Sequence, residues 1–132
     1  MEVTQETNKK TILVVDDDAS ILGTVSDVLV HDYHVLRANS GEEALQLSKD
    51  CQSELYLLLS DFQMPGMSGV ELATQITVLR PNIKVLLMSG YPAGMLILNE
   101  GWHFLAKPFI PSQLRALIVG LVSPEHASRF SA

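Results

Sequence analysis

The sequence of 132 residues contains a single cysteine, Cys51, so an internal disulfide framework is excluded. A chain without disulfides depends on a hydrophobic core, and a hydrophobic fraction of 47% is ample for one. A lone thiol is also typical of proteins in a reducing compartment. We therefore expect one folded domain of ordinary size, located in the cytoplasm.

Long apolar runs and clusters of basic residues are missing as well. No stretch reaches the roughly 20 apolar residues of a membrane-spanning helix, and the first ten residues are polar. The formal net charge is −6, without the concentration of lysine and arginine that marks a nucleic-acid-binding surface. We therefore expect neither a membrane nor a nucleic acid as a direct partner.

The sequence does contain short apolar runs that alternate with amphipathic segments. The apolar runs predict strands at residues 11–15, 33–38, 55–60, 83–89 and 102–106. Apolar residues recur at helical spacing in segments 21–29, 39–50, 67–81 and 110–122. Ser40 with Glu43, and Ser68 with Glu71, have the spacing of a capping box at a helix start. Continuous apolar strands that alternate with helices predict a parallel sheet covered on both faces.

Polar residues stand at the predicted carboxyl ends of these strands, where open parallel sheets form their binding sites. They are Asp16, Asp17 and Asp18 after the first strand, Ser60 and Asp61 after the third, Ser89 and Gly90 after the fourth, and Lys107 and Pro108 after the fifth. Carboxylates this close together repel one another unless a cation neutralises them, and carboxylate oxygens suit Mg²⁺. The pattern therefore predicts a magnesium site, with Asp18 expected to be a turn or cap residue rather than a metal ligand.

Four segments, taken together and in order, resemble the motifs of receiver domains of bacterial two-component response regulators. They are ILVVDDD, LLLSDFQMPGMSG, VLLMSGY and FLAKPF. The resemblance implies a doubly wound, five-stranded, flavodoxin-like α/β fold. It covers a domain at residues 10–122, between a flexible N-terminal segment 1–9 and a C-terminal tail 123–132. It also implies transfer of a phosphoryl group from a histidine kinase or phosphotransfer protein, which switches a surface for a downstream protein.

The resemblance implies a role for each matching residue. Asp61 corresponds to the phosphoacceptor, and Lys107 to the lysine that pairs with a phosphoryl oxygen. Asp17 corresponds to a direct Mg²⁺ ligand, together with Asp61 and the backbone carbonyl of Gln63. Asp16 corresponds to the acid that acts on the metal through water.

Two further positions match the residues that carry the conformational signal in this family. Ser89 corresponds to the switch hydroxyl, which also completes the catalytic set with Asp61 and Lys107. Phe104 corresponds to the switch aromatic. Tyr91, two residues after the switch hydroxyl, is bulky and should slow hydrolysis of the aspartyl phosphate.

Two other functions compete with the receiver on the residues alone. A small Mg²⁺-dependent phosphohydrolase would use Asp61 as its nucleophile, but such enzymes usually place a second acid where this chain has Gln63. A pseudo-receiver would act only as an interaction module, which the complete set of acids, hydroxyl and lysine argues against. We expect a signalling domain that catalyses only its own phosphorylation and dephosphorylation.

The sequence departs from the family between Tyr91 and Trp102. Ten residues, PAGMLILNEG, stand where the family usually has a full fourth helix with its loops. The segment is short by roughly four residues, or about one helical turn. We therefore expect a shortened fourth helix that leaves Met95–Leu98 partly uncovered, and no phosphorylation-driven dimer through that face.

Overall fold

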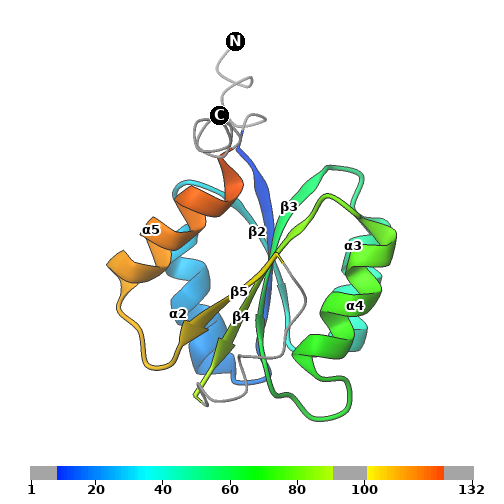
Figure 1. Ribbon diagram of the computed structural model, residues 1–132, viewed down its shortest axis with the longest axis horizontal. Helices are drawn as coiled ribbons and strands as arrows, with labels where there is room; N and C mark the ends of the chain where they lie inside the picture. The colour runs from blue at the N-terminus through cyan, green and yellow to red at the C-terminus, as the bar shows by residue number, and fades with distance from the viewer. Residues whose placement is uncertain (1–8, 91–100, 124–132) are drawn as a thin grey trace.

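The computed structural model describes residues 9–90 and 101–123, which form a parallel sheet between two layers of helices (Figure 1). The strands are β1 (Thr11–Val15), β2 (His34–Ala38), β3 (Leu55–Asp61), β4 (Lys84–Ser89) and β5 (Trp102–Ala106). The helices in these two ranges are α2 (Ala19–Leu29), α3 (Gly41–Asp50), α4 (Gly69–Leu79) and α5 (Pro111–Val122). The expected short helix and the uncovered Met95–Leu98 fall on residues 91–100, outside the described part of the chain.

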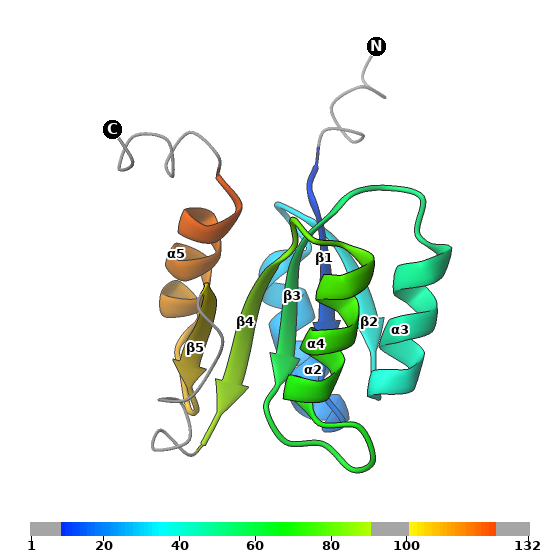
Figure 2. The same cartoon turned by 45° about the vertical axis from the view of Figure 1, so that its right-hand side comes forward.

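The strand order is β2-β1-β3-β4-β5, and all four pairings are parallel. This is the doubly wound, flavodoxin-like order, which confirms the expected fold class. The chain leaves β1 for β2 on one side and returns to β3 on the other, so the direction of winding reverses between β1 and β3. Ligands of such sheets bind outside the carboxyl ends of the strands at this switch point. Figure 2 shows the strand ends gathered at one edge of the sheet.

The core has two halves, one on each face of the sheet. Figure 1 shows α3 and α4 on one face, and α2 and α5 on the other. Alternate residues of each central strand point to opposite halves: in β1, Leu13 and Val15 face α3 and α4, whereas Ile12 and Val14 belong to the cluster with α2 and α5. All four are fully buried. Burial on both faces explains why Ile12–Val15 of β1 form an uninterrupted apolar run.

The start of α4 carries the predicted capping box. The Ser68 hydroxyl accepts a hydrogen bond from the Glu71 amide at 3.1 Å, and the Glu71 carboxylate accepts one from the Ser68 amide at 2.9 Å. At α3 the Ser40 hydroxyl accepts from the Glu43 amide at 3.1 Å, but the Glu43 carboxylate accepts from the amide of Asn39. These bonds satisfy amides that the helices cannot pair internally, and they fix where each helix begins.

The buried face of α4 stops before the C-terminal end of the helix. Leu72, Ala73 and Ile76 are buried against the sheet, whereas Leu79 is 48% exposed. Leu79 is the last helical residue and lies beyond the part of α4 that the sheet covers. Arg80, the next residue, anchors this end through hydrogen bonds to the carbonyls of α3 and of the turn after it.

Candidate functional site

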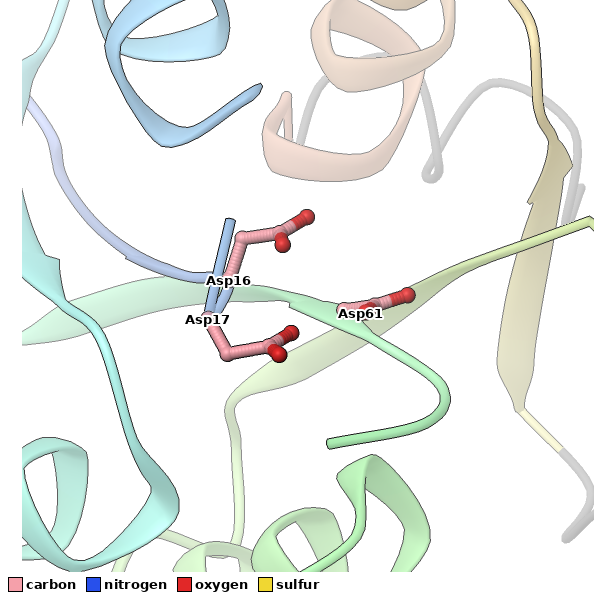
Figure 3. A group of neighbouring side chains, drawn as sticks. All are labelled: Asp16, Asp17 and Asp61. Atoms are coloured by element: carbon pink, nitrogen blue, oxygen red, sulfur yellow. The ribbon is translucent and has the colours of Figure 1, made fainter. Parts of the chain in front are cut away.

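Three carboxylates from two adjacent strands meet at the switch point of the sheet. Asp16 and Asp17 follow β1, and Asp61 is the last residue of β3. Because β1 and β3 are parallel neighbours, their carboxyl ends lie side by side. One carboxylate oxygen from each residue lies within 4.8 Å of the others. Figure 3 shows all three side chains extending to the same side of the strand ends.

Asp16 is the buried member of this cluster. Its side chain is 1% exposed, and its two oxygens accept hydrogen bonds from the Asp18 amide at 2.9 Å and from Lys107 Nζ at 3.3 Å. Burial raises the pKa of Asp16, and the neighbouring charge of Asp61 raises it further, while the two hydrogen-bond donors offset part of this increase. The charged form of Asp16 is therefore costly to bury, and a bound cation would stabilise it.

Lys107 is the positive group of the site. Its ammonium nitrogen lies 3.1 Å from Asp61 Oδ1 and 3.3 Å from Asp16 Oδ2. Burial by itself would lower the pKa of Lys107, but the hydrogen bond to Asp61 and the charges of both aspartates outweigh burial and raise it. Lys107 is therefore protonated at neutral pH.

The charges of the site do not balance. Three carboxylates face one ammonium, which leaves two negative charges when all of these groups are ionised. One divalent cation would neutralise this excess, and an all-oxygen donor set favours Mg²⁺ or Ca²⁺ over softer metals. The acidic cluster predicted from the sequence is thus assembled, and its donors fit the predicted metal.

The loop from β3 to α4 carries one further oxygen donor. The Asp61 carbonyl accepts from the Ser60 hydroxyl at 2.9 Å, and the Phe62 carbonyl accepts from the Gly69 amide at 3.0 Å. Gln63 is exposed, and its carbonyl accepts no hydrogen bond from the residues that the structure describes. Among the described residues, no hydrogen bond competes for this carbonyl, to which the resemblance assigns a metal-ligand role.

Asp18 lies next to the cluster and caps α2, which is one of the two structural roles expected for it. Its Oδ1 accepts hydrogen bonds from the amides of Ser20 at 2.9 Å and Ile21 at 3.2 Å, at the start of α2. The side chain is therefore engaged by the helix that follows β1. Of the three consecutive aspartates, only Asp16 and Asp17 belong to the acidic cluster.

The two predicted switch residues lie on β4, the neighbour of β3, and on β5, one strand further from Asp61. Ser89 ends β4 and is buried, and its carbonyl accepts from the Lys107 amide at 2.8 Å. Phe104 lies in β5, half-buried, and its ring contacts that of Phe62 at a centroid distance of 5.8 Å and an interplanar angle of 53°. Sequence reasoning assigned no role to Phe62. Phe62 follows Asp61 directly in the sequence, but this position alone does not predict that its ring contacts Phe104 of β5.

An apolar groove opens beside Lys107, between α2 and the loop that leads into α5. Its volume is about 460 Å³, and its lining includes Ile21, Thr24, Val25, Pro108 and Phe109 together with Lys107. The groove is thus continuous with the charged site.

Residues 12–119 match the response regulator receiver domain family, and the chain belongs to that family. It is 34% identical over 111 residues to the sensor kinase CckA of Brucella abortus, covering 81% of this chain and 12% of that protein. It is 34% identical over 113 residues to the uncharacterized transcriptional regulatory protein YrkP of Bacillus subtilis, covering 82% of this chain and 47% of that protein. The chain therefore spans less than half the length of these curated relatives.

Solved structures show the same fold. A CheY-like response regulator receiver domain protein from Methanospirillum hungatei superposes with a TM-score of 0.80 at 30% identity, covering 92% of this chain and 99% of that chain. The receiver domain of the hybrid histidine kinase CckA superposes with a TM-score of 0.76 at 29% identity, covering 86% and 99%.

Family membership confirms the expected class of function. The chain is a receiver domain of two-component signalling, and the phosphohydrolase and pseudo-receiver alternatives are not favoured. Receiver domains in general bind Mg²⁺ and interact with histidine kinases or phosphotransfer proteins. None of the helices in the described residues is long and apolar enough to cross a membrane.

Proposed function

We propose that residues 10–122 form a cytoplasmic receiver that accepts a phosphoryl group on Asp61 in a Mg²⁺-dependent reaction. The donor is a histidine kinase or a phosphotransfer protein. Phosphorylation of Asp61 then switches a surface that binds a downstream protein. The observation that carries this proposal is the 3.1 Å hydrogen bond from Lys107 to Asp61 within the three-carboxylate cluster. This contact places a candidate nucleophile beside a positive charge for the transferred group and beside oxygen atoms that can bind a metal.

Asp61 is better suited to act as the nucleophile than the other two aspartates. Asp16 is buried, and its two oxygens are engaged by Asp18 and Lys107. Asp17 is exposed and forms no ion pair with Lys107. The Asp61 side chain is 14% exposed, so it is open to a donor on one side while Lys107 contacts it on the other.

In the proposed reaction an Asp61 oxygen attacks the phosphorus of the donor phosphohistidine. The new O–P bond gives an aspartyl phosphate, the P–N bond breaks, and its electron pair returns to the imidazole ring of the donor. The Lys107 ammonium offsets negative charge on a phosphoryl oxygen. Asp16, Asp17, Asp61 and the Gln63 carbonyl would hold Mg²⁺, which supplies further charge neutralisation at the phosphoryl group.

Ser89 and Phe104 would transmit the phosphorylation of Asp61 to the protein surface. Ser89 lies at the end of the strand between Asp61 and Lys107, where its hydroxyl can donate to a phosphoryl oxygen. Phe104 is on the next strand and contacts Phe62, the residue after Asp61. Movement of Ser89 toward the phosphoryl group would change the space available to the Phe104 side chain. Phe104 would then change position, and this would alter the surface at β5.

The apolar groove beside Lys107 would receive the donor protein. A phosphohistidine can react with Asp61 only if its carrier lies against the surface next to the site. The groove between α2 and the loop before α5 provides apolar contact area at that place.

Incubation with acetyl phosphate and Mg²⁺, followed by mass spectrometry, tests the proposal. We expect the mass of one added phosphoryl group, mapped by borohydride reduction and peptide sequencing to Asp61. Asp61→Asn should abolish it, whereas Asp27→Asn, a change of an exposed aspartate on α2, should leave it unchanged. Labelling of another residue in the unsubstituted chain would contradict the assignment.

A further inference from the structure

The first residue of α4, Gly69, lies against the backbone of Asp61. A Cβ atom built at Gly69 would overlap the Asp61 carbonyl oxygen, and would lie 3.1 Å from both the Asp61 carbonyl carbon and the Phe62 Cα. These obstacles are backbone atoms, so no side-chain rotation could relieve the overlap. Either α4 or the Asp61 peptide would have to move if residue 69 carried a side chain.

Hydrogen bonds from three sides hold the peptide groups around Asp61. The Phe62 carbonyl accepts from the Gly69 amide at 3.0 Å, and the Phe62 amide donates to the Met88 carbonyl of β4 at 2.7 Å. The Asp61 carbonyl accepts from the hydroxyl of Ser60, which is fully buried. The backbone that carries the proposed phosphoacceptor therefore has fixed neighbours on the β4 side, on the α4 side and within β3.

We propose that Gly69, with Ser60, is a positioning residue for Asp61: the close approach of α4 sets where the phosphoacceptor carboxylate lies. The inference rests on the proposed function of Asp61 and extends it to a residue that touches no reacting atom. A backbone shift moves the carboxylate with it, and would disturb its 3.1 Å contact with Lys107 and its place among the metal donors. Reactions that depend on such alignment lose up to about 100-fold in rate from a displacement of about 1 Å.

Gly41 offers a matched control because it occupies the same position in α3. It follows the cap Ser40 and precedes Glu43, just as Gly69 follows Ser68 and precedes Glu71. A Cβ at Gly41 would also be crowded, but by the Met67 side chain, 2.7 Å from its sulfur and 2.8 Å from its Cβ. Alanine at either glycine therefore changes the first residue of a capped helix and creates a clash, but only at Gly69 is the obstacle the Asp61 backbone.

Gly23 in α2 supplies a second control. A Cβ there would meet no atom within 4 Å. Gly23→Ala thus reports the effect of alanine in a helix without any clash. The three alanine variants would be compared at a temperature at which circular dichroism shows each of them folded.

The first measurement is the initial rate of labelling by acetyl phosphate at saturating Mg²⁺. We expect Gly69→Ala to be slower by about tenfold or more, with Gly41→Ala and Gly23→Ala within about twofold of the unsubstituted chain. The second measurement is the ¹³C resonance of the Asp61 carboxyl group, which should shift in Gly69→Ala and stay in place in Gly41→Ala. A role confined to folding would move neither quantity in a folded sample.

The outcomes separate this inference from the proposed function. Equal labelling rates and equal Asp61 resonances in Gly69→Ala and Gly41→Ala would overturn the inference while the proposed function stands. No labelling of Asp61 in the unsubstituted chain would overturn the proposed function, and the resonance would still test the position of the carboxylate. If Gly69→Ala does not fold, Ser60→Ala removes one restraint without adding an atom, and an unchanged rate and resonance there would overturn the inference.

Discussion

Lys107 donates a hydrogen bond to Asp61 at 3.1 Å, although the strands that lead to these two residues are not neighbours. Asp61 ends β3, Lys107 follows β5, and β4 lies between them. The lysine therefore extends across the end of β4, where Ser89 is the last strand residue. The site depends on the relative placement of three strands, so its properties report directly on that part of the sheet.

Replacing Lys107 should have opposite effects on metal binding and on phosphorylation. Lys107→Met removes the cation that contacts Asp16 and Asp61 while keeping most of the side-chain volume. We expect tighter Mg²⁺ binding, because a competing positive charge is gone. We expect slower labelling by acetyl phosphate, by about 100-fold, the usual cost of removing one stabilising group from a reacting centre. Titration calorimetry measures the Mg²⁺ affinity, and mass spectrometry measures the labelling rate. Weaker Mg²⁺ binding in Lys107→Met would contradict the expected gain in affinity.

Mg²⁺ should stabilise the fold through the acidic cluster. A ligand that binds only the folded state adds about 2.7 kcal/mol to the free energy of unfolding when its concentration is 100 times its dissociation constant. The melting temperature should therefore rise with Mg²⁺ across the millimolar range. Asp17→Asn should remove most of this rise, and Asp27→Asn, on the exposed side of α2, should keep it. A melting temperature that does not respond to Mg²⁺ would argue against the site.

His103 should make stability fall in mildly acidic solution. Burial lowers the pKa of His103 below its ordinary value of 6.5, and the positive charge of Lys84 lowers it further. Between the lowered pKa and 6.5, the unfolded chain binds more protons than the folded one, so the free energy of unfolding decreases as pH falls through this window. His103→Gln should show a smaller decrease than the unsubstituted chain in urea denaturation at pH 7.5 and pH 5.5. Parallel curves for the two proteins would contradict this.

Arg80 should contribute to stability by tying α4 to α3. Its guanidinium group donates to the carbonyls of Ser48 at 2.8 Å, Cys51 at 2.7 Å and Ser53 at 2.9 Å. We expect Arg80→Ala to lower the free energy of unfolding by about 2 kcal/mol, since hydrogen bonds to charged donors contribute more than neutral ones. Arg80→Lys should recover only part, because one ammonium cannot reproduce the planar fork. Urea denaturation measures both, and an unchanged midpoint in Arg80→Ala would refute the prediction.

The groove beside Lys107 should matter for a protein donor and not for a small one. Thr24 is an exposed residue of α2 that lines the groove. Thr24→Glu places a charge among apolar residues and should slow transfer from a histidine kinase or phosphotransfer protein by about tenfold, an energetic cost of about 1.4 kcal/mol. Labelling by acetyl phosphate should stay the same. Equal slowing with both donors would show that the substitution disturbs Asp61 instead.

Much of the fold could be predicted because its signals are local. Val14 and Leu59 lie in continuous apolar runs, which are typical of strands buried on both faces, and both are fully buried. Ser68 and Glu71 predicted the start of α4 because both partners of a capping box lie within one turn. The acidic cluster was predictable for a related reason: once the sheet is parallel, the carboxyl ends of its strands must share one edge.

The sequence by itself thus determined the elements, their alternation and the residue types at the strand ends. The tertiary structure decided which of these groups touch. It placed β4 between β3 and β5, so that Lys107 must cross Ser89 to reach Asp61. It brought Gly69 against the Asp61 carbonyl, a contact between backbones that no residue pattern encodes. Periodicity and capping depend on neighbours along the chain, whereas these contacts depend on how whole strands and helices pack, and that is settled only when the core has formed.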